Sequence, residues 1–158
     1  MPSLRTPTLT LRGVPVRLHA SLLLIVALVA LTVVERLALR FPAGAAAALA
    51  VLVGVLLVVS VLVHELAHAL EARTRGGSVG GIRLFALGGV TELSDHGRTP
   101  RAELAVAAAG PWASLVVASA CGLGASAAEQ WLGGDAGAAM GLVLGLTGWL
   151  NLGLVAVN

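Results

Sequence analysis

The stretch FPAGAAAALAVLVGVLLVVSVLVHELAHAL, residues 41–70, decides the fold. Before His64 it contains no charged residue, and at about 1.5 Å of helical rise per residue a run of that length crosses a hydrocarbon core of roughly 30 Å. The same apolar run then holds His64, Glu65 and His68 close together. A charged residue at the membrane centre costs about 2.5–3.5 kcal/mol, so these three titratable groups indicate a functional site.

The composition of the whole chain favours insertion into a membrane. Of its 158 residues, 58% are hydrophobic and only 11% are charged, and the mean hydropathy is +0.95. These values lie outside the range of ordinary soluble domains. Uncharged runs long enough to cross a bilayer occur at 18–34, 41–63, 104–128 and 136–158. We therefore predict an all-α, multi-pass membrane protein with about four transmembrane helices and the lipid bilayer as a partner.

The arginines predict the orientation of the chain. Only Arg36 and Arg40 lie between the first two apolar runs. The other arginines precede the first run or lie between the second and third: Arg5, Arg12, Arg17, Arg73, Arg75, Arg83, Arg98 and Arg101. Because arginine-rich loops stay in the cytoplasm, we expect both termini to face the cytoplasm, with the cell membrane as the location. Nothing in the charge pattern indicates nucleic-acid binding.

The connection between the second and third runs, residues 72–101, is predicted to hold a small cytoplasmic β-hairpin. Its segment GGIRLFALGGVTEL, residues 80–93, has strand-forming residues on both sides of Gly88 and Gly89, which favours a glycine turn between two strands. A lone hairpin is marginally stable, so we expect it to pack on the membrane face or on the helices. No inserted domain fits in this connection, and residues 1–158 are interpreted as a single transmembrane core.

The third and fourth runs carry helix-breaking and helix-packing residues. Pro100 suits the first turn of a helix, whereas Gly110 and Pro111 are predicted to break or kink it within the bilayer. The fourth run has small residues at intervals of four: Gly133, Gly137, Gly141 and Gly145. Such a stripe favours close helix packing, either within one bundle or in a homo-oligomer.

The HELAH segment has the spacing of a metal site. On a helix His64 and His68 share a face, so both imidazoles can be directed at one metal ion with Glu65 beside them as general base. Zinc accepts neutral imidazole and lowers the pKa of water to about 7, and a nearby carboxylate can take the proton as water attacks a carbonyl. The alternatives are a packed helix whose polar groups satisfy one another and a proton relay. Glu71 shares the face but is expected to pair with Arg75.

Several segments, taken in order along the chain, resemble the site-2 protease family of intramembrane zinc metalloproteases. They are GVPVRLHASLLL (13–24), LVHELAHAL (62–70), LFALGGVTEL (84–93), AELAVAAAGPWASL (102–115) and WLNLGLVAVN (149–158). The resemblance implies that His64 and His68 bind Zn²⁺ and that Glu65 activates water. It also implies that Asn158 matches the asparagine that opens the family's Asn-x-x-Pro segment and helps to hold the substrate strand or the oxyanion.

The family's third protein ligand is an aspartate about eight residues after that asparagine. We therefore expect the sequence to be a C-terminally truncated fragment that is inactive alone. The resemblance implies regulated proteolysis, with a transmembrane protein or peptide as substrate. The hairpin at Gly88 and Gly89 is hypothesised to pair with the substrate as an edge strand. A metal or proton transporter and a catalytically inactive scaffold remain as alternatives.

Overall fold

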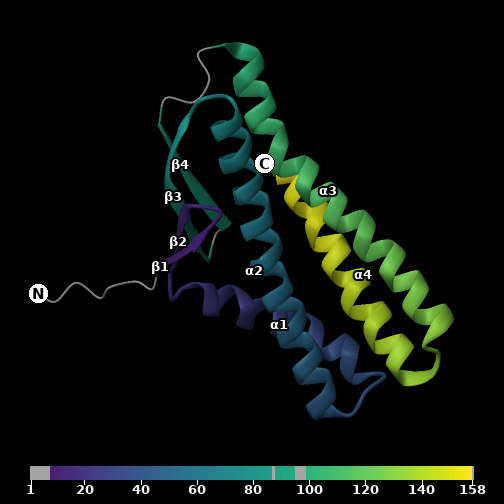
Figure 1. The fold of residues 1–158 in the computed structure, drawn as a ribbon. Helices are drawn as coiled ribbons and strands as arrows, with labels where there is room; N and C mark the ends of the chain where they lie inside the picture. Colours follow the sequence, from purple (N-terminus) through teal and green to yellow (C-terminus); the bar gives the residue numbers. More distant parts are fainter. Residues whose placement is uncertain (1–7, 87, 95–98, 158) are drawn as a thin grey trace, which may run out of the picture.

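The computed structural model describes residues 8–86, 88–94 and 99–157 (Figure 1). The elements follow in the order β1 (Thr8–Leu11), β2 (Val14–Leu18), α1 (Leu22–Ala38), α2 (Ala43–Thr74), β3 (Ser78–Phe85), β4 (Gly88–Ser94), α3 (Pro100–Trp131) and α4 (Gly134–Val157).

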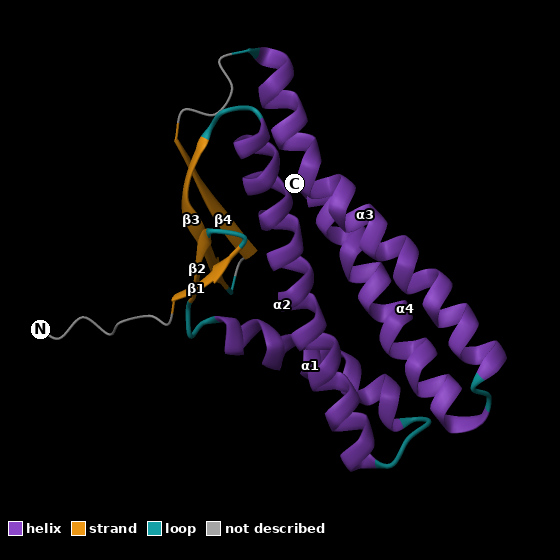
Figure 2. Cartoon of the chain, in the orientation of Figure 1, coloured by secondary structure: helices purple, strands orange, loops and turns teal. Residues whose placement is uncertain are grey.

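The helix α2 is the central element, and every other layer packs against it. The sheet lies along one side of its C-terminal half, α3 and α4 lie together on the other side, and α1 crosses it obliquely (Figures 1 and 2). Contacts join α2 to all three other helices and to strands β3 and β4. A residue on the C-terminal half of α2 can therefore be reached from the sheet and from α3.

The sheet has four strands in the order β1-β2-β3-β4, with β2 and β3 parallel and the other pairs antiparallel. The predicted hairpin is confirmed as β3 and β4, and the sheet is larger than predicted because β1 and β2 join it. Val14 and Val16 of β2 are fully buried, since alternate residues of a strand face the same side. With Ile82 and Leu84 they form a core against Ala69 of α2.

Two glycine-containing turns connect the sheet to α2. Arg12 and Gly13 have φ angles of 48° and 76°, the left-handed values that a two-residue hairpin turn requires. Arg73 donates hydrogen bonds of 2.8 Å to the carbonyl oxygens of both residues, which ties this turn to the end of α2. Gly76, with φ of 82°, ends α2, and the next amide, that of Gly77, donates to the Ala72 carbonyl. Three residues thus suffice to lead the chain from the end of α2 at Thr74 into β3 at Ser78.

The predicted position of the hairpin glycines is wrong in one respect. β3 ends at Phe85 and β4 begins at Gly88, so Gly88 and Gly89 are the first residues of β4 and not the turn itself. They pair with Phe85 and Leu84 in the antiparallel register. The physical reason is that Gly89 lies against α2, where a side chain would not fit.

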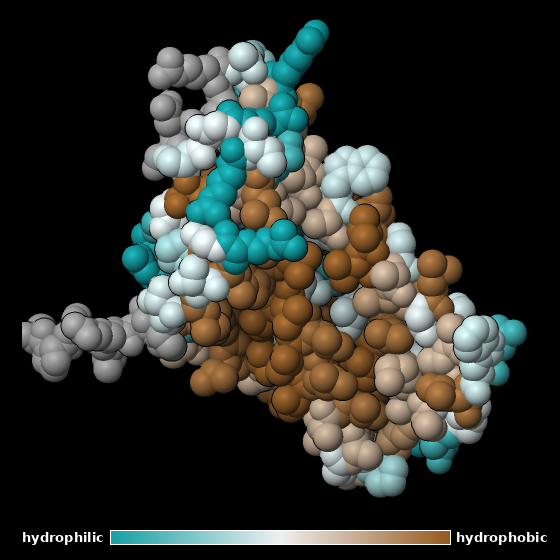
Figure 3. Space-filling view, viewed as in Figure 1, coloured by the Kyte–Doolittle hydropathy of each residue, from teal (hydrophilic) through white to brown (hydrophobic). Residues whose placement is uncertain are grey.

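Among the described residues, three helices are long and apolar enough to cross a membrane: α2, α3 and α4. The shorter α1 is not among them, so a fourth span stays a prediction. Apolar residues cover the helical part in Figure 3, and hydrophilic residues gather over the sheet and at the opposite end. This distribution fits a helical bundle in lipid with a polar sheet at one surface.

α3 continues through Gly110 and Pro111, so the helix is not broken there, and a kink at these residues stays a prediction. Neighbouring helices allow a transmembrane helix to tolerate a proline. The predicted start is confirmed: Pro100 is the first helical residue, and the Thr99 hydroxyl accepts a 3.3 Å hydrogen bond from the Ala102 amide.

The glycines of the fourth helix pack it against α3. A methyl group at Gly137 would lie 2.7 Å from the Ala128 carbonyl oxygen, and one at Gly141 would lie 2.8 Å from a Glu129 carboxylate oxygen. These two positions of the glycine stripe therefore serve packing within the chain.

Gly54 sets how closely α1 approaches α2, and Gly54→Ala tests it. A methyl group there would lie 2.9 Å from the Val26 carbonyl oxygen and 3.1 Å from its Cα. Both are backbone atoms that cannot rotate away, so we expect a loss of about 1–3 kcal/mol, measured as a lower apparent Tm in detergent. The control is Gly44→Ala on the same helix, where the methyl would meet no described atom within 4 Å. Equal Tm values for the two variants would contradict the close packing.

Candidate active site

The three residues of the HELAH segment lie on α2 where it passes between the sheet and α3. His64 is buried, with 5% of its surface exposed, and Glu65 and His68 are partly buried. The two imidazole rings lie edge to face with their centroids 4.9 Å apart. A methyl group at Gly110 of α3 would lie 2.5 Å from Nε2 of His64 and closer still to Nε2 of His68. Both Nε2 atoms therefore converge on one point beside Gly110.

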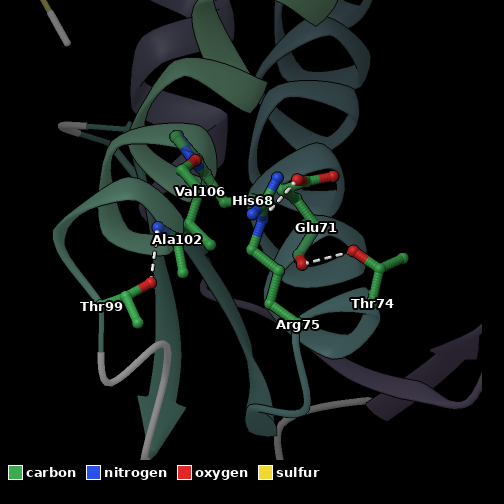
Figure 4. Close-up of polar contacts among 7 residues, drawn as sticks. All are labelled: His68, Glu71, Thr74, Arg75, Thr99, Ala102 and Val106. Atoms are coloured by element: carbon green, nitrogen blue, oxygen red, sulfur yellow. Dashed lines mark hydrogen bonds and ion pairs between the residues drawn. The ribbon is translucent and has the colours of Figure 1, made fainter.

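The ring of His68 is fixed by the backbone of α3 (Figure 4). Its Nδ1 atom lies 2.7 Å from the carbonyl oxygen of Val106. A carbonyl oxygen only accepts, so Nδ1 carries the hydrogen and donates it. In a neutral ring Nε2 then holds the lone pair, which is the form in which imidazole binds a metal.

The ring of His64 is held by α3 as well, about two turns after Val106. Its Nδ1 atom forms a 2.9 Å hydrogen bond with the hydroxyl of Ser114, which is almost fully buried. Val106, Gly110 and Ser114 recur at intervals of four and so share one face of α3. Their roles were not predicted, although this repeat of small residues was a signal that could have shown a face packed against α2.

Glu65 faces the sheet. Its Oε2 atom accepts a 2.7 Å hydrogen bond from the hydroxyl of Thr91 on β4. A methyl group at Gly89, also on β4, would overlap Cγ of Glu65 and lie 2.8 Å from its Cδ. The strand therefore packs directly on the carboxylate, and Gly89 leaves the space for it. Of the two predicted hairpin glycines, Gly89 lies at the site, whereas a methyl at Gly88 would meet no described atom within 4 Å.

Two further residues, Glu71 and Asn158, were considered from the sequence. Glu71 accepts a 2.7 Å hydrogen bond from Nε of Arg75, which confirms the predicted ion pair on the exposed end of α2 (Figure 4). Asn158 lies outside the described residues. Within residues 8–86, 88–94 and 99–157, no group of three or more His, Cys, Asp or Glu side chains lies close enough to hold a metal ion.

The donor chemistry of the two histidines fits a zinc ion. Neutral imidazole nitrogen is a preferred zinc ligand, and both Nε2 atoms point to the same space. Histidines that bind metals generally have the other ring nitrogen hydrogen-bonded to a carboxylate, a backbone carbonyl or water. Here the Val106 carbonyl holds that nitrogen of His68, and the Ser114 hydroxyl holds that of His64. His64 and His68 could thus supply two ligands, with Glu65 one residue away on the sheet side.

Comparison with known proteins agrees with this arrangement. Residues 52–157, which include the HELAH segment, Gly110 and Ser114, match peptidase family M50. The chain belongs to the site-2 protease family, peptidase family M50. It is accordingly an integral membrane protein of a metalloprotease family.

Two curated relatives are similar in sequence. The chain is 36% identical over 152 residues to "Putative zinc metalloprotease sll0528" of Synechocystis sp., which covers 94% of this chain and 38% of that protein. It is 46% identical over 59 residues to "Putative zinc metalloprotease Rip3" of Mycobacterium tuberculosis, which covers 37% of this chain and 15% of that protein. This chain thus spans well under half the length of these curated relatives.

The fold is similar to that of the site-2 protease from Methanocaldococcus jannaschii. The TM-score is 0.54 and the sequence identity 21%, and the match covers 96% of this chain and 69% of that chain. The likeness supports the arrangement of helices and sheet described above.

Gly110→Ala is expected to remove the space in which the two imidazoles meet. The added methyl would overlap both Nε2 atoms, so the rings must rotate away from their partners on α3. We expect the Zn²⁺ affinity of the protein to fall by at least roughly tenfold. The measurement is zinc content after dialysis against a graded chelator.

The matched control is Gly122→Ala on the same helix, where a methyl would meet no described atom within 4 Å. Its zinc content is expected to equal that of the unmodified protein. Full zinc retention in Gly110→Ala would show that the point of convergence is not the metal position.

Proposed function

We propose that this chain forms the catalytic core of an intramembrane zinc endopeptidase that cleaves membrane-anchored proteins within or near their transmembrane segments. The observation that carries the proposal is the convergence of Nε2 of His64 and His68 beside Gly110, with Glu65 on the adjacent face of α2. Membership of the site-2 protease family supports it. The site lies on a helix apolar enough to cross a membrane.

In this proposal His64 and His68 would hold zinc through Nε2. The ion, when bound, polarises a peptide carbonyl and lowers the pKa of water. Catalytic zinc usually has three protein ligands. We therefore propose a third donor from residues other than the described ones, and the family resemblance points to an aspartate shortly after Asn158.

The proposed role of Glu65 is proton transfer. Its carboxylate takes a proton from the attacking water as the water oxygen bonds to the carbonyl carbon of the substrate. It then gives that proton to the amide nitrogen as the C–N bond breaks, so the carboxylate is regenerated. Such transfer needs the carboxylate beside the reacting atoms, and we propose that Glu65, next to His64 on α2, reaches them from the sheet side.

The proposed substrate segment is extended and pairs with β4. A helical segment in lipid has all its backbone groups hydrogen-bonded, so it must unwind before a carbonyl can reach the site. Among the described strands β4 has only β3 as a neighbour, and its other edge can accept a strand. Gly89 and Thr91 on this edge strand contact Glu65, so a segment paired there would run past the base. We also propose cytoplasmic termini, from the arginine distribution.

Glu65→Gln is expected to lower the cleavage rate by at least about 10²-fold, because glutamine cannot accept the proton. The assay follows cleavage of a transmembrane substrate by the natural protein in lipid, with zinc content measured in parallel and expected to be unchanged. Glu71→Gln is the matched control, since Glu71 lies on the same helix but pairs with Arg75.

Three outcomes separate the candidate functions. Cleavage by the Glu71 variant but not by the Glu65 variant supports the proposal. Undiminished cleavage by Glu65→Gln would refute the mechanism, and metal flux with no cleavage would favour a transporter.

Cysteine crosslinking tests the pairing of substrate with β4. In a Cys121→Ser background, Val90→Cys on β4 is expected to form a disulfide with a single cysteine near the scissile bond of the substrate. The control is Leu9→Cys on β1, the other edge of the same sheet, because Leu9 and Val90 have similar exposed fractions of 53% and 49%. Equal crosslinking at both positions would argue against β4 as the docking edge.

A further inference from the structure

Thr91 contacts the catalytic carboxylate although it lies on a different element. Its hydroxyl oxygen is 2.7 Å from Oε2 of Glu65 and 3.2 Å from the main-chain carbonyl oxygen of the same residue. Both contacts are partly buried. Gly89, two residues earlier on β4, faces the same side chain. The strand β4 therefore contacts Glu65 in two ways. Thr91 donates a hydrogen bond to it, and Gly89 leaves space for it because glycine has no side chain.

We propose that Thr91 is a positioning residue for Glu65, which places the base for proton transfer and links it to the edge strand. The inference rests on the proposed protease function. Glutamate has three rotatable side-chain bonds, and its carboxylate is useful only where it meets the attacking water. A donor fixed on Oε2 limits these rotations and leaves Oε1 to take the proton. Thr91 thus orients the Glu65 carboxylate before the reaction starts. Without Thr91, the side chain would have to reach that orientation during the reaction.

The Thr91 hydroxyl lies within hydrogen-bond distance of two acceptors on Glu65. A threonine hydroxyl carries one hydrogen, so it donates to Oε2 or to the main-chain carbonyl, but not fully to both. Buried donors without an acceptor are costly, so two acceptors on the same residue keep the Thr91 hydroxyl at Glu65.

The position of Thr91 on β4 couples the base to the strand proposed to bind substrate. Thr91 pairs with Ile82 of β3, whose side chain is fully buried in the sheet core against α2. The hydroxyl is therefore held by the packing of the sheet on α2. A shift of β4 when a substrate strand pairs with it would move the donor relative to Glu65. Occupancy of the edge strand and orientation of the base are thus linked by one hydrogen bond.

The test compares Thr91→Val, which keeps the shape but loses the hydroxyl, with Thr91→Ser, which keeps the hydroxyl. In the natural protein we expect Thr91→Val to lower kcat by roughly 10- to 100-fold with little change in KM. Thr91→Ser should restore most of kcat. Thr10→Val, an exposed threonine on β1, is the matched control and should leave both constants unchanged. Zinc content should be equal in all of them.

A structural readout separates positioning from packing. In experimental structures of the variants, the Glu65 carboxylate should stay against β4 in Thr91→Ser and leave that position in Thr91→Val. Equal losses of kcat in the valine and serine variants would assign the effect to packing and overturn the inference. Unchanged kcat in Thr91→Val, with Glu65→Gln inactive, would also overturn it while leaving the protease function intact. Cleavage by Glu65→Gln would instead refute the function on which the inference rests.

Discussion

Polar side chains in the apolar part of α2 need partners from the neighbouring elements, and the arrangement of the site depends on this constraint. An unsatisfied polar group in a dry, apolar setting costs several kcal/mol. The hydrogen-bond partner of His68 is the Val106 carbonyl, and that of His64 is the Ser114 hydroxyl. Both partners lie on α3, so α3 must pass α2 at this height. The same two hydrogen bonds turn Nε2 of both rings toward one point, and the cost of burying the histidines is offset by contacts that also orient them.

The second requirement is that the neighbouring elements approach α2 closely. Glycines on two of these elements allow this. Gly110 on α3 leaves room where the imidazoles converge, and Gly89 on β4 leaves room beside Glu65. The two glycines face the same stretch of α2 from opposite layers of the fold. A site built from long side chains on one helix therefore needs neighbours without side chains at the points of contact. This explains why small residues gather around the HELAH segment and not only along α4.

The sequence allowed prediction of the features that depend on local pattern. The apolar run of α2, the spacing of His64 and His68, the hairpin and the Glu71–Arg75 pair all depend on residues close in the chain. The parallel pairing of β2 with β3 joins residues far apart, such as Val16 and Ile82, and no local pattern indicates it. The alternation of Val14 and Val16 was present in the sequence, but no strand was predicted there. Thr91 and Ser114 could not be assigned because their partners are set by packing between elements.

A second buried polar contact shows how α4 is aligned with the site. The side-chain amide of Asn151 donates to the Ser60 hydroxyl at 2.8 Å, and both residues are buried. Ser60 lies one turn before His64 on α2, and α2 and α4 run in the same direction (Figure 1). From Asn151 to Val157, α4 rises about 9 Å, which brings its end to the height of the two histidines. The contact between Asn151 and Ser60 thus places the end of α4 at the level of the converging Nε2 atoms.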